Sequence, residues 1–554
     1  MALKIIITSA ALLTLSAVVS PISQASLAPV YGAINVAVNH AQAVRITSTI
    51  GFSMGAMSWT DGPLDVLPWL AVWAFWIPVL EEIQVLFSGA LGPVYGPMLS
   101  GFTSCQTVII LAAHACMGPL NKVYDFEAKF GKNIGIFAPV GAAMGIYFGL
   151  EKFFSETAFN DLSGLDPVKL QVLMALAFWA LALLQYRRSH WKIYLLILPA
   201  LFHTYLLNPH LESGFSTRGL ESSLAQQNWT LLDRQWSNTG YISVIENVER
   251  GYRVLRCDHS LLGGEWTLTP KRQQSEGWKV GEPIYSVFEM LEAVRLMELS
   301  PRISDEDAKA LIIGLGIGTA PKALAAHGID TTTVEIDPIV YALATKYFGL
   351  PVTNNVVVQD AVSFVNSAVS TKSQKYDYII HDVFTGGAEP LNLFNLEFIQ
   401  SLRALLTSNG VAAINYAGDL TLPLSGLVLN TISKAFDGQC KIFRDGAPPA
   451  KSENVDEDEV DFINMVVFCR NKPGSISFRK PVKADFLESK SRESYLYPRA
   501  DYEIPFPTVD VEDDKDDVLK RGKESDWKLH QAQGAQRHWK IMRAVVPDRV
   551  WELW

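Results

Sequence analysis

The sequence predicts a chain in two parts, a multi-pass α-helical membrane domain and an α/β domain that a β-hairpin module precedes. Long apolar stretches dominate from Met1 to Leu207, whereas the residues from Asn208 onward have the composition of a soluble protein. In this second part, strand-like apolar runs alternate with helix-like segments, which is typical of a mostly parallel, doubly wound sheet. The sharpest local feature is a glycine turn within Leu311–Thr319, which follows a strand-like run.

Apolar segments in the first part approach the length that an α-helix needs to cross a bilayer, about 20 residues. We expect roughly five to seven spans, because short polar loops separate these segments. A soluble bundle of unusually apolar helices is the alternative. The first segment is either a signal peptide or an uncleaved helix. The segments are Ile5–Val19, Ile46–Trp59, Val66–Leu80, Ile83–Leu99, Val108–Leu120, Ile134–Leu150, Val168–Leu184 and Trp191–Leu207.

Three further regions follow the membrane domain of residues 1–207. Residues 208–300 predict a β-hairpin module, with strands at Gly240–Ile245 and Tyr252–Cys257, and a connecting helix at Tyr285–Leu299. Residues 301–472 predict the α/β domain. Residues 473–554 form a polar, proline-interrupted extension, in which we expect one helix at Trp527–Val546 and find no chemistry.

The α/β domain is predicted from alternating elements whose connections would be right-handed crossovers. Ligands of such sheets bind at the carboxyl ends of the strands. An antiparallel pair at Lys441–Arg444 and Phe462–Arg470 closes the domain. The expected strands are Ala310–Gly314, Thr332–Ile336, Asn355–Val358, Tyr376–His381 and Gly410–Tyr416, and the expected helices are Ala320–His327, Pro338–Phe348, Ala361–Ala368, Leu396–Leu406 and Leu422–Phe436.

Charge and cysteine content argue against several kinds of site. The net charge of −10 is unlike that of a nucleic-acid-binding protein, which needs clustered Lys and Arg. The cysteines form no C-x-x-C pair and no cluster with histidine, so the sequence predicts neither a metal site nor a disulfide framework. They are Cys105, Cys116, Cys257, Cys440 and Cys469.

The spacing of the glycines distinguishes two kinds of nucleotide ligand. A dinucleotide site needs G-x-G-x-x-G, but here Gly314, Gly316 and Gly318 give G-x-G-x-G. This spacing is typical of domains that bind an adenosylmethionine-type donor, which carries no pyrophosphate. Glu335 ends the next strand, where an acid accepts hydrogen bonds from ribose hydroxyls, and Asp360 follows the third strand, where it suits the adenine amino group. NAD binding and a plain strand-to-helix turn are the alternatives.

The order of these motifs resembles the polyamine aminopropyltransferases, which are the spermidine and spermine synthases. The motifs are the glycine turn, V-E-I-D-P at Val334–Pro338, V-x-x-D-A-x-x-F at Val357–Phe364, and Tyr378–Asp382. The resemblance covers roughly Asn238 to Asn471 and looks closest to the branch fused to membrane helices. It implies a Rossmann-like, class I methyltransferase-type fold, S-adenosylmethionine or its decarboxylated form as donor, an amine or other nucleophile as acceptor, no metal, and a role in polyamine biosynthesis.

The resemblance also implies a role for each matching residue. Asp382, at the end of the fourth strand, would face the attacking amine and accept its proton, and His381 is the second catalytic candidate. The nucleoside pocket would be lined by Gly314, Gly316, Gly318, Glu335 and Asp360.

Three positions depart from the family pattern. Synthases carry an Asp inside the glycine turn that grips the donor's amine, and this chain has Ile317. They carry a second Asp three residues after the position of Asp382, and this chain has Thr385. A Tyr-Gln pair ahead of the domain falls loosely on Tyr285 and Ser286, which keeps only the Tyr. The nucleoside pocket is therefore kept, whereas the polyamine pocket largely is not.

Three functions are consistent with this pattern. The first is a membrane-anchored transferase that moves an aminopropyl group to an amine through an altered acceptor site. The second is an S-adenosylmethionine-dependent methyltransferase, which the apolar Ile317 favours because the intact donor brings its own carboxylate. The third is a nucleoside-binding sensor or transporter without catalysis. The expected partners are a small-molecule nucleophile and the lipid bilayer, not nucleic acid; assembly as a homodimer stays open.

Two features give opposite predictions for the side of the membrane. The basic loop at Arg187–Lys192 belongs in the cytosol by the positive-inside rule, so one further span would place the catalytic half on the other side. The glycosylation pattern at Asn228–Thr230 agrees. However, adenosyl-sulfonium donors are made in the cytosol, and Trp191–Leu207 is short enough to lie in the interface. We expect an integral, multi-pass protein with a cytosolic catalytic domain.

Overall fold

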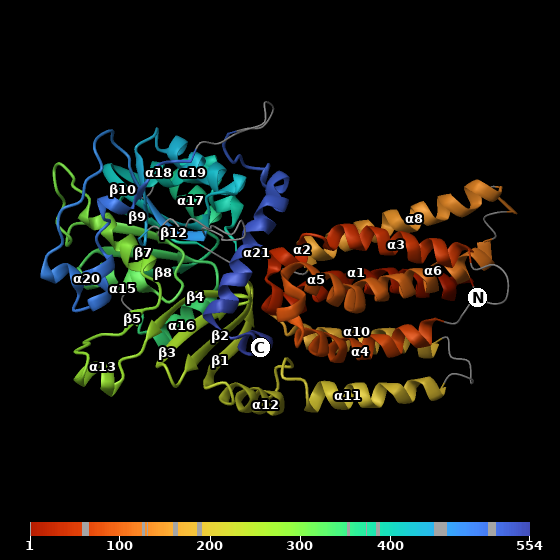
Figure 1. Cartoon of the computed structure of the whole chain (residues 1–554). Coiled ribbons are helices and arrows are strands. Elements are labelled where there is room, and N and C mark those ends of the chain that lie inside the picture. Colours follow the sequence, from red (N-terminus) through yellow and green to blue (C-terminus); the bar gives the residue numbers. More distant parts are fainter. Residues whose placement is uncertain are drawn as a thin grey trace, which may run out of the picture. The chain divides into compact units, whose positions relative to one another are not determined.

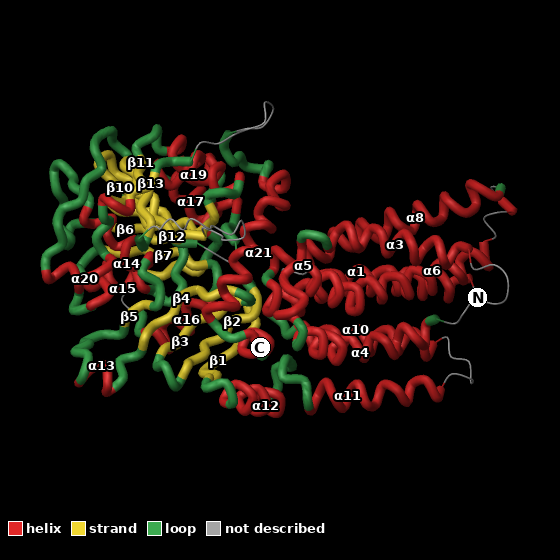
Figure 2. Tube along the Cα trace, in the orientation of Figure 1, coloured by secondary structure: helices red, strands yellow, loops and turns green. Residues whose placement is uncertain are grey.

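The computed structural model describes residues 2–57, 66–124, 128–129, 131–158, 164–184, 191–351, 355–372, 374–383, 388–447, 462–507 and 517–554. These residues divide into two compact units. The helical unit comprises Met1–Gln227, Trp236–Tyr241 and Arg543–Trp554, and the α/β unit comprises Asn228–Gln235 and Ile242–Met542. Figure 1 and Figure 2 show these two kinds of architecture.

The helical unit is built around α1, which packs against α6, α8 and α10. Short π-helical segments at Phe102–Gln106 and Phe154–Ala158 follow α5 and α8. A short α22 at Asp548–Glu552 also belongs to this unit. The helices are α1 (Ala2–Tyr31), α2 (Ala33–Ala37), α3 (His40–Met57), α4 (Leu67–Val85), α5 (Ser88–Gly101), α6 (Thr107–Tyr124), α8 (Lys132–Phe153), α10 (Pro167–Leu184), α11 (Ile197–Leu206) and α12 (Gly214–Ala225).

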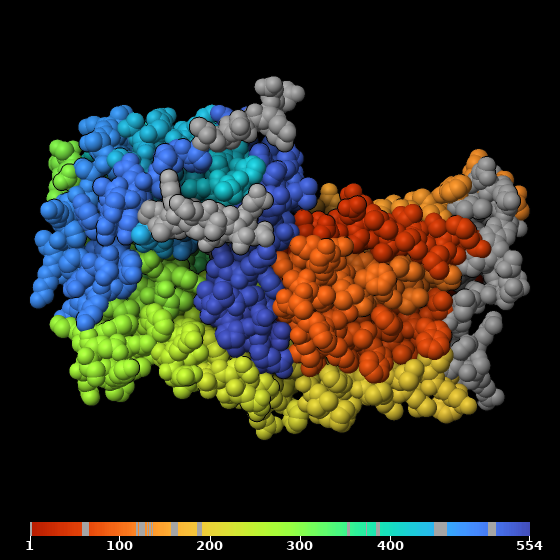
Figure 3. Space-filling view, viewed as in Figure 1, coloured from red at the N-terminus to blue at the C-terminus, as the bar shows by residue number. Residues whose placement is uncertain are grey.

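The surface of the helical unit is apolar as well as its core. Large side chains such as Leu3, Tyr95 and Phe137 are 70%, 70% and 72% exposed; Figure 3 shows one face of the molecule in space-filling form. Among the described residues, three helices are long and apolar enough to cross a bilayer: Leu3–Tyr31, Ser88–Met117 and Pro167–Leu184. Membrane crossing, and the number of spans, stay predictions.

The β-hairpin module is a five-stranded sheet in the order β1-β2-β3-β4-β5. Its strands β2 and β3 pair in antiparallel fashion and form the expected hairpin. The helix expected at Tyr285–Leu299 is shorter, because α14 (Val287–Leu291) passes into a 3₁₀ turn at Glu292–Leu296. The strands are β1 (Trp229–Ser237), β2 (Gly240–Asn247), β3 (Tyr252–Cys257), β4 (Ser260–Trp266) and β5 (Glu282–Pro283), and α13 (Pro270–Gln274) precedes β5.

The α/β unit contains an eight-stranded sheet in the order β13-β11-β12-β10-β9-β6-β7-β8. Strand β6 lies between β7 and β9 and is parallel to both, so the strand order changes direction at β6. Crevices at such switch points are where doubly wound sheets bind ligands. The strands are β6 (Lys309–Ile313), β7 (Asp330–Glu335), β8 (Asn355–Val358), β9 (Tyr376–His381), β10 (Leu406–Asp419), β11 (Cys440–Arg444), β12 (Phe462–Arg470) and β13 (Glu503–Ile504).

Helices cover both faces of this sheet, which confirms the expected Rossmann-like α/β architecture (Figure 1). Local signals set several helix starts. Asp337 caps α16 by accepting the amide hydrogen of Ile339 at 2.8 Å, with Pro338 at the first helical position. The helices are α15 (Thr319–Ala326), α16 (Pro338–Phe348), α17 (Ala361–Ser370), α18 (Leu396–Leu405), α19 (Pro423–Ala435), α20 (Lys490–Tyr495) and α21 (Lys528–Val545).

The structure corrects the expectation about cysteines, because Cys440 and Cys469 form a disulfide. The two residues lie directly opposite each other on the antiparallel strands β11 and β12, with their Cα atoms 4.1 Å apart. They are 29 positions apart in the sequence, so no short spacing motif reveals the pair. Pairing of the two strands is what brings the thiols together.

We predict that replacing both cysteines (Cys440→Ser with Cys469→Ser) lowers the free energy of unfolding of the α/β unit by about 3 kcal/mol, because the unfolded chain loses a cross-link. Thermal unfolding of the full-length protein, followed by tryptophan fluorescence without reductant, measures the loss. Dithiothreitol provides the control, since it should lower the melting temperature of the wild type and leave that of the double variant unchanged. Equal melting temperatures without reductant would contradict the prediction.

Candidate functional site

The glycine turn after β6 is held in a conformation that side chains cannot adopt. Gly314, Gly316 and Gly318 all have positive φ, at 91°, 54° and 80°, a region in which glycine is favoured. A Cβ atom on Gly314 would overlap the carbonyl oxygen of Asp382, and one on Gly316 would lie 2.5 Å from the carbonyl oxygen of Leu262. The main chain of the turn is therefore closely packed, and a side chain at Gly314 or Gly316 would not fit.

Glu335 joins the glycine turn to the end of β7. Its Oε2 accepts the amide hydrogen of Leu315 at 3.0 Å, and its Oε1 accepts the amide hydrogen of Asp337 at 2.9 Å. Burial raises the pKa of the Glu335 carboxyl to about 7, although these two backbone bonds oppose the shift. A carboxylate can accept about four hydrogen bonds, so capacity remains for a hydroxyl of a ribose.

Asp360 follows β8 and begins α17. Its Oδ1 accepts the amide hydrogen of Ser363 at 2.8 Å, so this acid caps the helix. Its side chain is half-buried, and Oδ2 remains for a ligand. Asp360 thus caps α17 in the structure, in addition to the adenine contact that the resemblance implies.

Asp382 follows β9 directly beside the glycine turn. Its amide donates to the carbonyl oxygen of Ile313 on β6 at 2.8 Å, and its Oδ1 accepts from Asn415 Nδ2 at 2.7 Å. Burial raises the pKa of the Asp382 carboxyl to about 6, with the Asn415 bond opposing. Since Glu335 and Asp382 end the two neighbours of β6, the structure brings the predicted donor and acceptor residues to one edge of the sheet.

His381 lies in the core instead of at that edge. The ring is fully buried, its Nε2 donates to the carbonyl oxygen of Leu393 at 3.0 Å, and it packs edge-on against Phe394 with 4.7 Å between ring centroids. Burial lowers the pKa of the His381 imidazole to about 4. These contacts account for a neutral, packed histidine, and its catalytic role stays a prediction without support from its surroundings.

Ile317 is an apolar core residue within the glycine turn. It is 2% exposed and joins a cluster with Leu315, Val340 and Phe348. Its Cγ1 lies 3.0 Å from the point where a Cβ atom on Gly263 would sit. The position that carries an acid in synthases therefore offers no charge here. Thr385, at the position of the second synthase acid, lies outside the described residues.

Helix α21 supplies contacts at the ends of β9 and β10 that the sequence did not reveal. Arg537 forms an ion pair with Asp419, which is 1% exposed, and Gln531 Nε2 donates to the carbonyl oxygen of Glu389 at 2.7 Å. Tyr416 also donates to Glu389 Oε1, at 3.3 Å. The C-terminal extension therefore helps to build this edge of the domain. The sequence predicted only a helix at Trp527–Val546 there.

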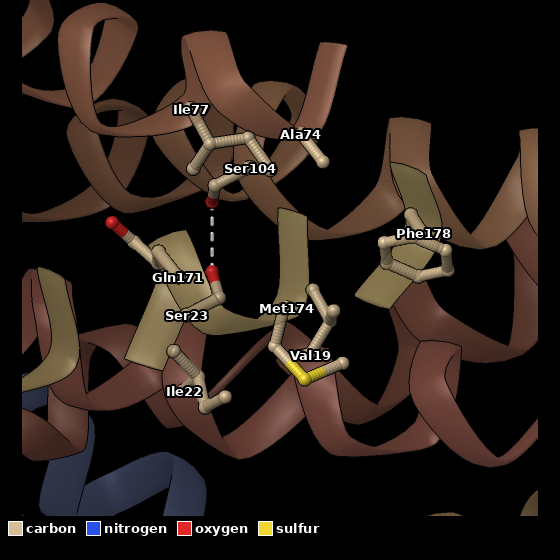
Figure 4. Close-up of a pocket in the computed structure, with 9 residues that line it drawn as sticks. All are labelled: Val19, Ile22, Ser23, Ala74, Ile77, Ser104, Gln171, Met174 and Phe178. Carbon is tan, nitrogen blue, oxygen red and sulfur yellow. Dashed lines mark hydrogen bonds between the residues drawn. The ribbon is translucent and has the colours of Figure 1, made fainter. Parts of the chain in front are cut away.

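Two small cavities are too confined for a nucleoside. One lies beside Glu389 and Tyr416 and has a volume of about 10 Å³. The other lies within the helical unit, has the same volume and contains a 2.8 Å hydrogen bond between the hydroxyls of Ser23 and Ser104 (Figure 4). Volumes of this size hold about one water molecule.

A wider cavity of about 320 Å³ lies beside α15, where Ile317, Thr319 and Lys322 line it. Its charges are already compensated, because Lys322 pairs with Glu265 at 3.5 Å and Arg492 with Glu292 at 2.8 Å. Among the described residues, no group of three or more His, Cys, Asp or Glu side chains could hold a metal ion.

Comparison with known proteins finds local similarity in the region of this site. The profile of the spermine/spermidine synthase domain matches residues 286–444. A polyamine aminopropyltransferase of Vibrio vulnificus is 40% identical over 111 residues, which cover 19% of this chain and 37% of that protein. A probable spermidine synthase from Corynebacterium glutamicum superposes with a TM-score of 0.35 and 15% identity, over 48% of this chain and 88% of that one.

The fold and site thus define a Rossmann-like, methyltransferase-type domain that carries a spermine/spermidine synthase segment. A far longer match exists to the N-terminal histidine N-methyltransferase of Emericella nidulans, which is 41% identical over 567 residues, covering 100% of this chain and 98% of that protein. The chain belongs to the family of that protein. The resemblance to aminopropyltransferases holds for part of the chain, and the expected alternative, methyl transfer, is better supported than aminopropyl transfer.

We predict that Glu335 makes donor binding pH-dependent. The ionised carboxylate accepts stronger hydrogen bonds than the neutral form, so the rise in melting temperature caused by S-adenosylmethionine should grow between pH 6 and pH 8. Without donor the sign is opposite: the raised pKa favours the protonated form in the folded state, so this group's contribution to stability is lost as pH rises through about 7.

Thermal shift measurements on Glu335→Gln test this prediction. The variant should lose most of the donor-induced shift and its dependence on pH. Glu306→Gln, at an exposed acid of the same unit, is the matched control and should behave like the wild type. A full, pH-dependent shift in Glu335→Gln would refute the role of this carboxylate.

Proposed function

We propose that this chain is an S-adenosylmethionine-dependent methyltransferase whose acceptor is a nitrogen of an N-terminal histidine residue. The observation that carries the proposal is the 41% identity with an N-terminal histidine N-methyltransferase over the whole chain. The site is compatible with it, because the glycine turn, Glu335 and Asp360 provide the groups that a nucleoside donor needs. Buried Ile317 offers no acid to grip the amine of a decarboxylated donor.

The reaction needs positioning more than chemical activation. A nitrogen lone pair of the acceptor attacks the methyl carbon next to the sulfonium, the carbon–sulfur bond breaks, and its electron pair stays on sulfur to give S-adenosylhomocysteine. The cationic product then loses a proton to Asp382 or to water, from the other ring nitrogen when the imidazole is methylated and from the methylated nitrogen itself when an amine is methylated. The carboxylate of Asp382, fixed by the hydrogen bond from Asn415, would orient the nitrogen in line with the breaking bond.

We predict that the full-length protein in detergent transfers the labelled methyl group of S-adenosylmethionine to a peptide that begins with histidine. A peptide with the same composition and histidine at its second position should accept roughly 100-fold less, since its first residue cannot place a ring nitrogen and an α-amine together. Asp382→Asn should reduce kcat about 100-fold and leave donor affinity nearly unchanged. Scintillation counting with mass spectrometry of the peptide measures both.

The competing outcome is aminopropyl transfer, which the local matches to polyamine enzymes suggest. A parallel reaction with decarboxylated donor and putrescine tests it. Product in that reaction, with no labelled peptide, would overturn the proposed function.

We further propose that the helical unit lies in a membrane and that the α/β unit faces an oxidising compartment. The apolar surface of the helical unit supports the first part. The disulfide between Cys440 and Cys469 supports the second, because such bonds persist outside the reducing cytosol. Asn228, in its glycosylation pattern, is exposed. This proposal departs from the cytosolic catalytic domain that the sequence predicts.

We predict that Asn228 carries an N-linked glycan when the protein is made in a eukaryotic secretory pathway. Treatment with an N-glycosidase, or the substitution Asn228→Gln, should then increase electrophoretic mobility by one glycan. Asn355→Gln is the control, since Asn355 is exposed and lies outside any glycosylation pattern. An unmodified Asn228 together with reduced Cys440 and Cys469 in protein from cells would place the α/β unit in the cytosol.

A further inference from the structure

A second carboxylate–amide pair lies at the same edge of the sheet as Asp382 and Asn415. Asp445 follows β11, and its Oδ2 accepts hydrogen bonds from Ser286 Oγ at 3.1 Å and from Asn464 Nδ2 at 3.3 Å. Ser286 immediately precedes α14, and Asn464 lies on β12. Donors from two separate elements thus hold this carboxylate, which itself follows a third.

Strand register places the two pairs on one face. Asn415 on β10 lies opposite Val466, and Ala417 lies opposite Asn464. Directly opposed residues point to the same face, and residues two apart on a strand do as well. Asn415 and Asn464 are therefore diagonal neighbours on the face of the sheet that α14 covers, at a typical separation of roughly 7–8 Å.

Asp445 is a half-buried acid without an ion pair among the described residues. Burial raises the pKa of its carboxyl, opposed first by the hydrogen bonds from Ser286 and Asn464 and last by the charge of Arg444. Arg444 lies opposite Met465 and hence on the other face of the sheet. Buried charges in proteins are ordinarily paired. Both donors reach Oδ2, so Oδ1 retains capacity for another partner.

One further polar atom of these pairs is buried without a hydrogen-bond partner. It is Oδ1 of Asn415, the partner of Asp382. Because nearly all buried polar groups in folded proteins find a partner, an unfilled one beside Asp382, together with the free Oδ1 of Asp445, indicates a place for a polar, positively charged ligand.

We propose that Asp445, held by Ser286 and Asn464, binds the protonated α-amine of the acceptor, while Asp382 and Asn415 hold the nitrogen that receives the methyl group. This proposal rests on the proposed function and names the residues that recognise the free chain end. The α-amine is the cationic nitrogen of an N-terminal histidine near neutral pH, since its pKa of about 8 exceeds the roughly 6.5 of the imidazole. Within one histidine, bond lengths place the α-nitrogen and the more distant ring nitrogen roughly 5–6 Å apart. Two neighbouring acids can contact both nitrogens at this distance.

Binding of two peptides tests the recognition of the α-amine without requiring a methylation step. Isothermal titration measures the affinity of full-length protein, saturated with S-adenosylhomocysteine, for a peptide with free N-terminal histidine and for its N-acetylated form. The wild type should prefer the free peptide roughly 10- to 100-fold. Asp445→Asn should abolish this preference and leave affinity for S-adenosylhomocysteine unchanged. Asp437→Asn, at the exposed acid before the same strand, is the control and should keep the preference.

Each other outcome overturns the assignment. A preference that survives in Asp445→Asn, or a wild type that methylates the free peptide yet binds both peptides equally, refutes it and leaves the proposed function intact. A wild type that neither binds nor methylates the free peptide overturns the proposed function itself, and this assignment with it. If Asp445→Asn loses S-adenosylhomocysteine binding, the milder double variant Ser286→Ala with Asn464→Ala decides instead: an undiminished preference there refutes the role of Asp445.

Discussion

The hydrogen bond from the Leu315 amide to the Glu335 carboxylate is the contact on which the donor site depends. It links a turn that leaves β6 to the end of β7, so the glycines and the acid keep one relative position before any ligand arrives. The packing of Gly314 against the main chain of Asp382 extends the same arrangement to β9. Three strand ends thus behave as one rigid frame, and a ligand need not organise them. Preorganisation of this kind lowers the entropy that binding would otherwise cost.

Local chemistry explains which parts of the fold could be predicted from the sequence. The ranges of α16 and β9 are those expected, because a capping Asp337 with Pro338 fixes one start and a dense apolar run fixes the other element. The sequence did not predict strand β1, the disulfide between cysteines 29 positions apart, or the hydrogen bond between Asn415 and Asp382. Each depends on partners that only the folded sheet brings together.

The same distinction applies within the site. The glycines, Glu335, Asp360 and Asp382 are visible in the sequence because they stand at strand ends in a recognisable order. Asp445 follows a strand too, but the position of its carboxylate depends on Ser286, which is 159 positions away, and on the register of β12. His381 was predicted as a catalytic candidate because it precedes Asp382 in the sequence. Side chains alternate between the two faces of β9, however, and that of His381 points into the apolar core.

The apolar Ile317 has a consequence for turnover. In the proposed reaction the donor and its by-product share the same nucleoside and differ in one methyl group and the sulfonium charge. Glu335 and Asp360 would contact only the shared part, and Ile317 contributes no charge that could sense the difference. S-adenosylhomocysteine would therefore compete with fresh donor on nearly equal terms. The steady rate would then follow the ratio of the two molecules around the protein, so a supply of donor and a means of removing the by-product become part of what sets its activity.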